Sequence, residues 1–233
     1  MKNAIVTGGT RGIGKQVVLD LLKRGYRVWT NYASDDAAAQ RARKEFECLG
    51  ECVVVKKDRE GGALFPLADS VFVDVIVGNA GTTLRKPFPE ITDEDWHRVL
   101  DTNLTENFAL VRDLYPRISQ NGRIVFIGSM MGVLPHGTSL PYGVSKAALH
   151  ALAQNLVKEF EGTGTTVNAV APGFVETEWQ KTKPEEIRQN IYRKTAVKRF
   201  ASVQEVASSV MFCIDNAFVN GTILEVSGGY CFK

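Results

Sequence analysis

A tyrosine and a lysine four residues apart form the clearest chemical pair in the sequence. Tyr142 and Lys146 lie in a segment expected to be helical, so their side chains share one helix face. A free phenol has a pKa of about 10, too high for efficient acid–base chemistry near neutral pH. An ammonium about 4 Å away would lower it by roughly three pH units, and desolvation would oppose part of that shift. We therefore expect the pKa of Tyr142 to be lowered, making its hydroxyl a proton donor and acceptor.

A serine upstream of this pair has the position expected of a carbonyl-binding group. Ser129 follows the apolar segment 123–128, which is expected to be a strand of a parallel sheet. Because ligands bind at the carboxyl ends of such strands, its hydroxyl could hold and polarise a substrate carbonyl. A tyrosine and a lysine at this spacing also occur by chance on surface helices, so the argument depends on further motifs.

A glycine-rich turn near the N-terminus has the composition of a phosphate-binding loop. Residues 7–14 have the sequence Thr-Gly-Gly-Thr-Arg-Gly-Ile-Gly. Glycine permits a tight turn, and it lets backbone amides approach a pyrophosphate at a helix N-terminus. The alternative is a turn that only packs the helix against the strand. The residues expected to contact a dinucleotide here are Gly8, Thr10, Arg11, Gly12, Ile13 and Gly14.

The end of the second expected strand, 27–32, indicates which dinucleotide binds. A carboxylate there would bind the ribose 2′-hydroxyl and repel a 2′-phosphate. The candidate contacts there have no carboxylate: Asn31, Tyr32, Ala33 and Ser34. Arg11 can reach a 2′-phosphate, whereas Asp35 and Asp36 are expected in the first turn of the next helix, where acidic residues commonly act as caps. NADP(H) is therefore the predicted cofactor.

The elements that must position these residues alternate between apolar and amphipathic segments. The apolar segments are continuous, which is typical of strands in a parallel sheet covered on both faces. The expected strands are 4–7, 27–32, 52–56, 71–77, 123–128, 166–171 and 222–226. The expected helices are 13–25, 37–49, 93–114 and 142–160. The prediction is an α/β fold with a doubly wound, Rossmann-like parallel sheet in a single domain, 1–233.

Composition and charge argue against several other classes of protein. The 233 residues carry a net charge of +2 without the basic stripe typical of nucleic-acid binding. No apolar run is long enough to cross a bilayer, and the expected first strand leaves no room for a signal peptide. Cys48 and Cys52 could share a helix face, but no nearby Cys or His would complete a zinc site. We expect reduced thiols, no metal and a cytoplasmic protein.

The motifs together resemble the short-chain dehydrogenase/reductase family over nearly the whole chain. Besides the glycine turn and the Ser129, Tyr142 and Lys146 set, three segments carry the resemblance: Asn79-Ala80-Gly81, Asp101-Thr102-Asn103-Leu104, and Pro172-Gly173 with Thr177. All follow the family's order at plausible spacing. The resemblance implies an enzyme that reduces a carbonyl to a secondary alcohol, with the hydride chemistry belonging to the cofactor.

The resemblance also implies roles for single residues. Tyr142 would donate the proton, Ser129 would orient the carbonyl, and Lys146 would also bind the nicotinamide ribose. Asn103 would hold a water in a proton relay or, alternatively, only cap a backbone kink. These four are the candidate catalytic residues, and Ser129 and Tyr142 are the candidate substrate contacts.

Further cofactor contacts are implied on both sides of the glycine turn. On the adenosine side they are Asn79, Ala80, Gly81 and Asp58, the last of which could instead be a simple turn residue. Around the nicotinamide they are Pro172, Gly173, Val175 and Thr177. His97, His136 and His150 are expected to be surface or packing residues, with His136 placed to line the pocket.

Within the family, the sequence is most similar to the 3-oxoacyl-[acyl-carrier-protein] reductases of fatty-acid synthesis and to acetoacetyl-CoA reductases. Segment 176–199 is similar to a mobile substrate loop. A reductase of another small ketone and a non-catalytic dinucleotide-binding regulator are alternatives, and the intact tyrosine–lysine pair argues against the regulator.

Several features bear on partners. The stretch 58–79 is short, which predicts a truncated helix there. Arg117 and Arg123 are the candidate residues that could hold an acidic carrier protein. Glu159 and Glu161 make that surface less suitable for such a partner. The resemblance also implies a homotetramer packed through the helices 93–114 and 142–160.

Overall fold

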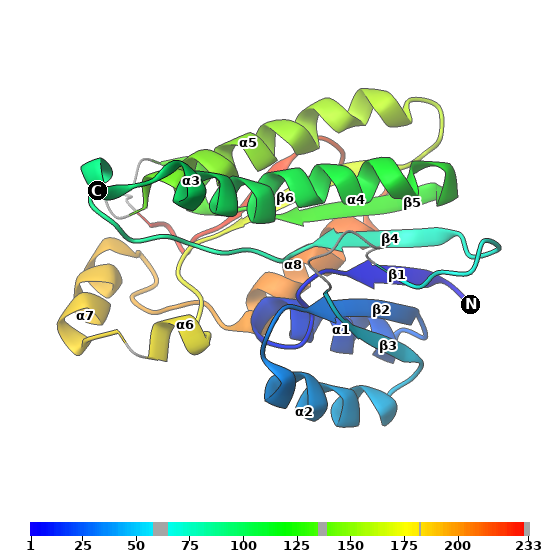
Figure 1. The fold of residues 1–233 in the computed structure, drawn as a ribbon, viewed down its shortest axis with the longest axis horizontal. Helices are drawn as coiled ribbons and strands as arrows, with labels where there is room; N and C mark the ends of the chain where they lie inside the picture. Colours follow the sequence, from blue (N-terminus) through cyan, green and yellow to red (C-terminus); the bar gives the residue numbers. More distant parts are fainter. Residues whose placement is uncertain (58–64, 135–138, 182, 231–233) are drawn as a thin grey trace.

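A sheet of seven parallel strands forms the centre of the molecule (Figure 1). The computed structural model describes residues 1–57, 65–134, 139–181 and 183–230. The strand order is β3-β2-β1-β4-β5-β6-β7. The strands are β1 (Asn3–Val6), β2 (Arg27–Tyr32), β3 (Cys52–Lys56), β4 (Val73–Gly78), β5 (Ile118–Ile127), β6 (Thr166–Pro172) and β7 (Ile223–Val226). Because all the strands run in one direction, their carboxyl ends form a single edge, and this confirms the predicted Rossmann-like fold.

Helices cover both faces of the sheet (Figure 1). One face carries α1 (Gly12–Lys23), α2 (Asp36–Glu47) and α8 (Val203–Asp215). The other carries α3 (Asp93–Leu100), α4 (Glu106–Leu114) and α5 (Leu140–Leu156). Two further helices, α6 (Glu178–Lys181) and α7 (Glu185–Lys194), lie beyond the carboxyl edge. In the described part of the chain, no helix is both long and apolar enough to span a bilayer.

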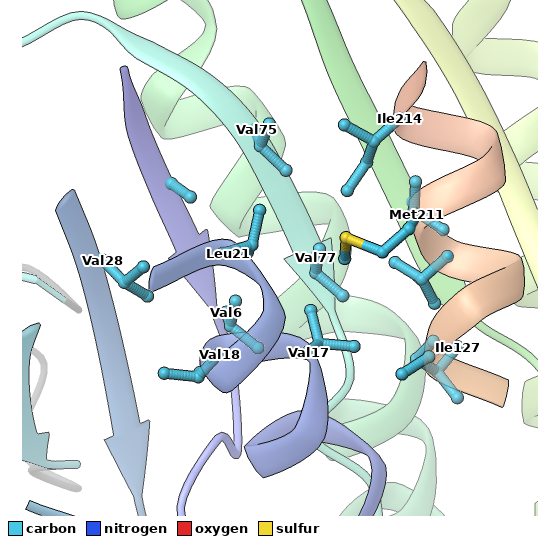
Figure 2. Close-up of a cluster of buried hydrophobic side chains, with 14 of the residues drawn as sticks. Val6, Val17, Val18, Leu21, Val28, Val75, Val77, Ile127, Met211 and Ile214 are labelled. Atoms are coloured by element: carbon cyan, nitrogen blue, oxygen red, sulfur yellow. The ribbon is translucent and has the colours of Figure 1, made fainter. Parts of the chain in front are cut away.

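The two helical layers bury the sheet by means of its continuous apolar strands. All seven residues of β6 are buried. Figure 2 shows one of the two clusters, in which Val17 and Leu21 of α1 and Met211 of α8 converge on Val6 and Val77 of the sheet. Burial of such apolar surface contributes about 25 cal/mol per Å², so these strands and helices hold the carboxyl edge in a fixed geometry.

Three helical regions differ from the prediction, and one of them is segment 176–199, which was expected to be a loop but carries α6 and α7. The expected helix 93–114 is divided by a π-helical turn at Asp101–Thr105, which separates α3 from α4. The sequence prediction also contained no helix at α8, although Ser202 and Glu205 form a capping box at its start. Of the described residues between β3 and β4, 57 and 65–72, none is helical, which agrees with the expected truncation.

The switch in strand order lies between β1 and β4. The chain leaves β1 toward β2 on one side and later returns to β4 on the other side. In open α/β sheets, ligands bind in the crevice outside such a point. The glycine turn after β1 and residues 79–81 after β4 are located there.

Candidate active site

Side chains from neighbouring strands hold the glycine turn between β1 and α1. Asn31 of β2 accepts a hydrogen bond from the Gly8 amide at 2.8 Å. After β4, the Asn79 side chain donates to the carbonyls of Thr7 and Gly8 at 2.9 and 3.1 Å. Gly8 and Gly12 have positive φ angles of 65° and 57°, which favour glycine. Asn31 and Asn79 therefore stabilise the backbone of the turn.

The beginning of α1 fits a phosphate group. Its N-cap residue, Arg11, makes no side-chain capping bond, and the first helical turn has no acidic residue. The first amides of a helix lack partners within the helix, so these groups and the helix dipole favour an anion. A Cβ on Gly14 would lie 2.6 Å from the Gly8 carbonyl oxygen, so the close packing of this turn requires glycine. Thr10 is buried and Ile13 half-buried in the same turn.

A polar cluster lies at the carboxyl ends of β2 and β3. The Lys56 ammonium is 2.8 Å from the Asp36 carboxylate, and the Tyr32 hydroxyl donates to the same carboxylate at 2.8 Å. These two bonds, with that of Lys56 the stronger, hold the pKa of Asp36 below its ordinary value. Asp35 caps α2 by accepting from the Ala38 amide, and Asp36 is in the first helical turn, as predicted. Ala33 and Ser34 connect the strand to this cap.

Ser129 and Tyr142 meet at the carboxyl edge, where a hydrogen bond joins their side chains. Burial raises the pKa of Tyr142, and the bond with Ser129 lowers it by less. The expected lowering is therefore wrong. The physical reason is the direction of Lys146, whose ammonium donates to the Ile127 carbonyl at 2.6 Å and lies 5.7 Å from the centre of the phenol ring. The phenol is thus protonated at neutral pH, as a proton donor must be.

Lys146 is almost fully enclosed by protein. Only 3% of its surface is exposed, and burial lowers its pKa to about 8. A Cβ on Gly81 would lie 3.6 Å from its ammonium nitrogen, so the β4 loop passes directly beside it. The structure therefore places Gly81 beside Lys146, a contact that the sequence analysis did not predict.

Asn103 lies in the π-helical turn and is completely buried. Its side chain accepts from the Thr82 amide at 2.7 Å and donates to the Thr82 carbonyl at 2.9 Å. It also donates to the Ser145 hydroxyl at 2.9 Å, and Ser145 in turn donates to the Tyr142 carbonyl at 2.8 Å. Asn103 therefore connects the kink, the β4 loop and α5, while its role in a proton relay stays a prediction.

The segment that follows β6 lies close to the glycine turn between β1 and α1. Pro172 ends β6, and the Gly173 amide donates to the Val226 carbonyl at 3.0 Å. Val175 is buried, and a Cβ on Gly12 would lie 3.7 Å from the Thr177 methyl group. The enclosure of a nicotinamide by these residues and the mobility of 176–199 both stay predictions.

Not every predicted residue is part of this constellation. Asp58 and His136 lie outside the described residues. Arg117 donates to the carbonyls of Val71 and Ala68, and Arg123 to four carbonyls that include those of Ile214 and Gly164. Both arginines are at the amino-terminal end of the sheet. They are therefore remote from the carboxyl edge and unsuitable as a docking pair beside it.

One buried residue at the site makes a contact that the sequence analysis did not predict. His150 is a buried packing residue, one of its two expected roles, and its Nε2 lies 3.3 Å from the Ser129 amide nitrogen. Its spacing from Tyr142 and Lys146, four residues at each step, contained the signal, because such residues share a helix face. His97, in contrast, is exposed. Among the described residues, no group of three or more His, Cys, Asp or Glu side chains could hold a metal ion.

Comparison with known proteins identifies relatives over nearly the full length. A family model described as short chain dehydrogenase matches residues 2–188. An acetoacetyl-CoA reductase of Rhizobium meliloti is 35% identical, covering 98% of each chain. The 3-oxoacyl-[acyl-carrier-protein] reductase FabG of Escherichia coli is 31% identical, covering 98% of this chain and 96% of its own. The solved angucycline C-6 ketoreductase LanV with bound NADP has a TM-score of 0.88 at 25% identity, covering 100% of this chain and 96% of its own.

Proposed function

Since the chain belongs to the short-chain dehydrogenase family, we propose that it reduces a 3-oxoacyl thioester to the 3-hydroxyacyl thioester with NADPH. The observation that carries this proposal is the protonated Tyr142 hydroxyl, hydrogen-bonded to Ser129 at the edge where ligands of such sheets bind. When bound, the reduced nicotinamide supplies a hydride to the carbonyl carbon. Tyr142 donates its proton to the carbonyl oxygen that Ser129 holds, and Lys146 holds the ribose.

The choice of NADP(H) rests on charge at the adenosine end. Arg11 lies in the glycine turn, Lys56 ends β3 opposite Tyr32 of β2, and the Asp36 carboxylate is already engaged by Lys56 and Tyr32. A 2′-phosphate brings a strong acceptor for cationic donors. The bound NADP of the ketoreductase LanV is consistent with this choice.

The thioester substrate is supported by the relatives and by two further cations. Both named relatives reduce an acetoacetyl or 3-oxoacyl thioester, as their names state. Arg85 follows β4 and Lys183 follows β6, so both extend from the carboxyl edge, and burial together with the nearby Arg85 lowers the pKa of Lys183. Two neighbouring cations repel each other, and a phosphate-bearing substrate would relieve that repulsion. A phosphate group of the coenzyme or of the carrier that holds the acyl chain would supply this negative charge.

The proposal has four further parts: the protein acts with a carrier protein, takes part in fatty-acid synthesis, forms a homotetramer and is cytoplasmic. Packing into a tetramer would cover an exposed apolar surface. It consists of Phe108 and Tyr115 on one helical segment and Val144 on α5. The described cysteines are free thiols, as expected in a reducing compartment.

The first test is oxidation of NADPH, followed by its near-ultraviolet absorbance. Acetoacetyl-CoA and an acetoacetyl-carrier protein are compared side by side, with NADH as the control cofactor. Turnover with either thioester supports the proposed reaction, and the ratio of the two rates identifies the carrier. NADPH binding without turnover of either would favour another small ketone, the second candidate substrate.

A further inference from the structure

His150 occupies a closely fitted socket beside Ser129. It lies one helical turn after Lys146 on α5, with only 6% of its surface exposed. Two glycines make room for the ring. A Cβ on Gly128 would lie 2.1 Å from the imidazole Nε2, and a Cβ on Gly132 would lie 2.9 Å from Cε1. The backbone on both sides of the serine is therefore built around this side chain.

The backbone hydrogen bonds between β5 and β6 end at Gly128, and the next amide contacts the His150 imidazole. The Gly128 amide still donates to the Val170 carbonyl of β6 at 2.7 Å. The next amide, that of Ser129, instead donates to His150 Nε2 at 3.3 Å. The imidazole thus accepts a hydrogen bond from the buried Ser129 amide, for which the sheet supplies no acceptor. A buried amide left without a partner would destabilise the fold by about 1–3 kcal/mol.

This contact requires a neutral ring in one tautomer. Nε2 can accept only when the imidazole proton is on Nδ1. Lys146 is the charged group that faces the ring, and residues 128–132 on the other side carry no ionisable side chain. Burial and the Lys146 charge lower the pKa of His150 to about 4, so the acceptor form is present at neutral pH.

We propose that His150 is a positioning residue for Ser129, holding its backbone so that its hydroxyl faces Tyr142. This inference rests on the proposed carbonyl reduction, in which Ser129 orients the substrate. His150 does not contact the reacting atoms. It acts through the serine, and a small displacement of an orienting group lowers the rate by up to about 100-fold.

The test compares His150→Leu, which removes the acceptor, with His150→Gln, which keeps an acceptor oxygen. The exposed His97→Leu is the matched control. For His150→Leu we expect kcat to fall by about 10- to 100-fold while the Kd of NADPH stays unchanged. His150→Gln should recover most of kcat. Wild-type kcat in a folded His150→Leu variant, or equal losses in both variants, would overturn the proposal.

A second measurement needs no substrate and no variant. Imidazole ¹⁵N chemical shifts of the wild-type protein at pH 7 should show Nδ1 protonated and Nε2 unprotonated. The Ser129 amide resonance should shift when the ring is protonated below about pH 4. An Nε2-protonated tautomer would refute the contact even if no ketone is ever turned over. Failure of this inference is therefore distinguishable from failure of the proposed function.

Discussion

Burial shifts the ionisable groups of Tyr142, Lys146 and the positioning residue His150 toward their neutral forms. It raises the pKa of Tyr142, lowers that of Lys146 to about 8 and, with the Lys146 charge, lowers that of His150 to about 4. At neutral pH the phenol is therefore protonated, the lysine is still mostly cationic and the imidazole is uncharged. This combination suits the direction of reduction, in which the protein gives a proton to the substrate.

The phenol should be indispensable for turnover. Tyr142→Phe removes only the hydroxyl that donates the proton, so we expect turnover to be abolished and NADPH binding to be nearly intact. Rates with acetoacetyl-CoA and a fluorescence titration with NADPH measure the two effects. Tyr115→Phe, at a half-exposed position, is the control. Comparable turnover in Tyr142→Phe would exclude the mechanism.

Cofactor preference should depend on Lys56. Lys56→Met removes a cation and leaves the Asp36 carboxylate without its ion-pair partner, so the Kd of NADPH should rise by about 10- to 100-fold, with a much smaller change for NADH. Asp36→Asn should have the opposite sign and tighten NADPH binding. Arg11→Ala should also weaken NADPH more than NADH. Titration of each variant with both dinucleotides decides the matter, and equal losses for the two would refute a 2′-phosphate contact.

Stability should fall in acid partly because of His150. Its folded pKa of about 4 lies below the ordinary value of 6.5, so the unfolded chain binds a proton more readily. Its contribution to the free energy of unfolding is complete above about pH 6.5 and decreases as the pH falls toward 4. Between pH 7 and 5 the loss should be about 1 kcal/mol after allowance for screening. Urea unfolding should show a weaker loss in His150→Gln than in His97→Gln.

At this scale the sequence predicted the candidate catalytic residues but not their electrostatics. The types and spacing of Ser129, Tyr142 and Lys146 can be read from the sequence alone. The direction of the ammonium toward the Ile127 carbonyl is not, because it depends on how α5 packs on β5. Nor does the sequence show that Gly128 and Gly132 open a socket for His150, since that requires the folded turn.

At the level of elements, local signals predicted the regular segments. Strands β2 and β3 have the predicted bounds, because each is a short apolar run between turn residues. The division between α3 and α4 was missed, because Asn103 forms the kink through its contacts with Thr82 and Ser145 from distant segments. The missing α8 is different, since its capping box and apolar spacing were available in the sequence.

Two elements should contribute jointly to substrate affinity. Lys183, before α7, and Arg85, after β4, come together only in the folded protein. For Lys183→Met we expect the KM of the thioester to rise about tenfold, because one anion contact is lost, with kcat unchanged. Steady-state kinetics measure this, and Lys158→Met, in the turn that follows α5, is the control. An unchanged KM would remove these cations from the substrate site.

At the level of the whole molecule, the exposed apolar surface should determine assembly. Phe108 is 43% exposed on α4, within the surface proposed for tetramer packing. Phe108→Glu would place a charge in that interface, so we expect the mass measured by light scattering to fall to half or less. Phe72→Glu, on the loop before β4, should leave the mass unchanged. A tetrameric Phe108→Glu protein would place the interface elsewhere.

The segment that carries α6 and α7 leaves and re-enters the body at almost the same point. Val175 and Ala201 form a parallel bridge, and the amides of Glu176 and Ala201 donate to the carbonyls of Ala201 and Phe174 at 2.8 and 2.9 Å. Its two ends are thus fastened together independently of its length, and a change of loop length costs little entropy. The segment is in effect a replaceable module. As the proposed substrate loop, it could be exchanged for one of another size to alter the range of ketones accepted without redesigning the sheet.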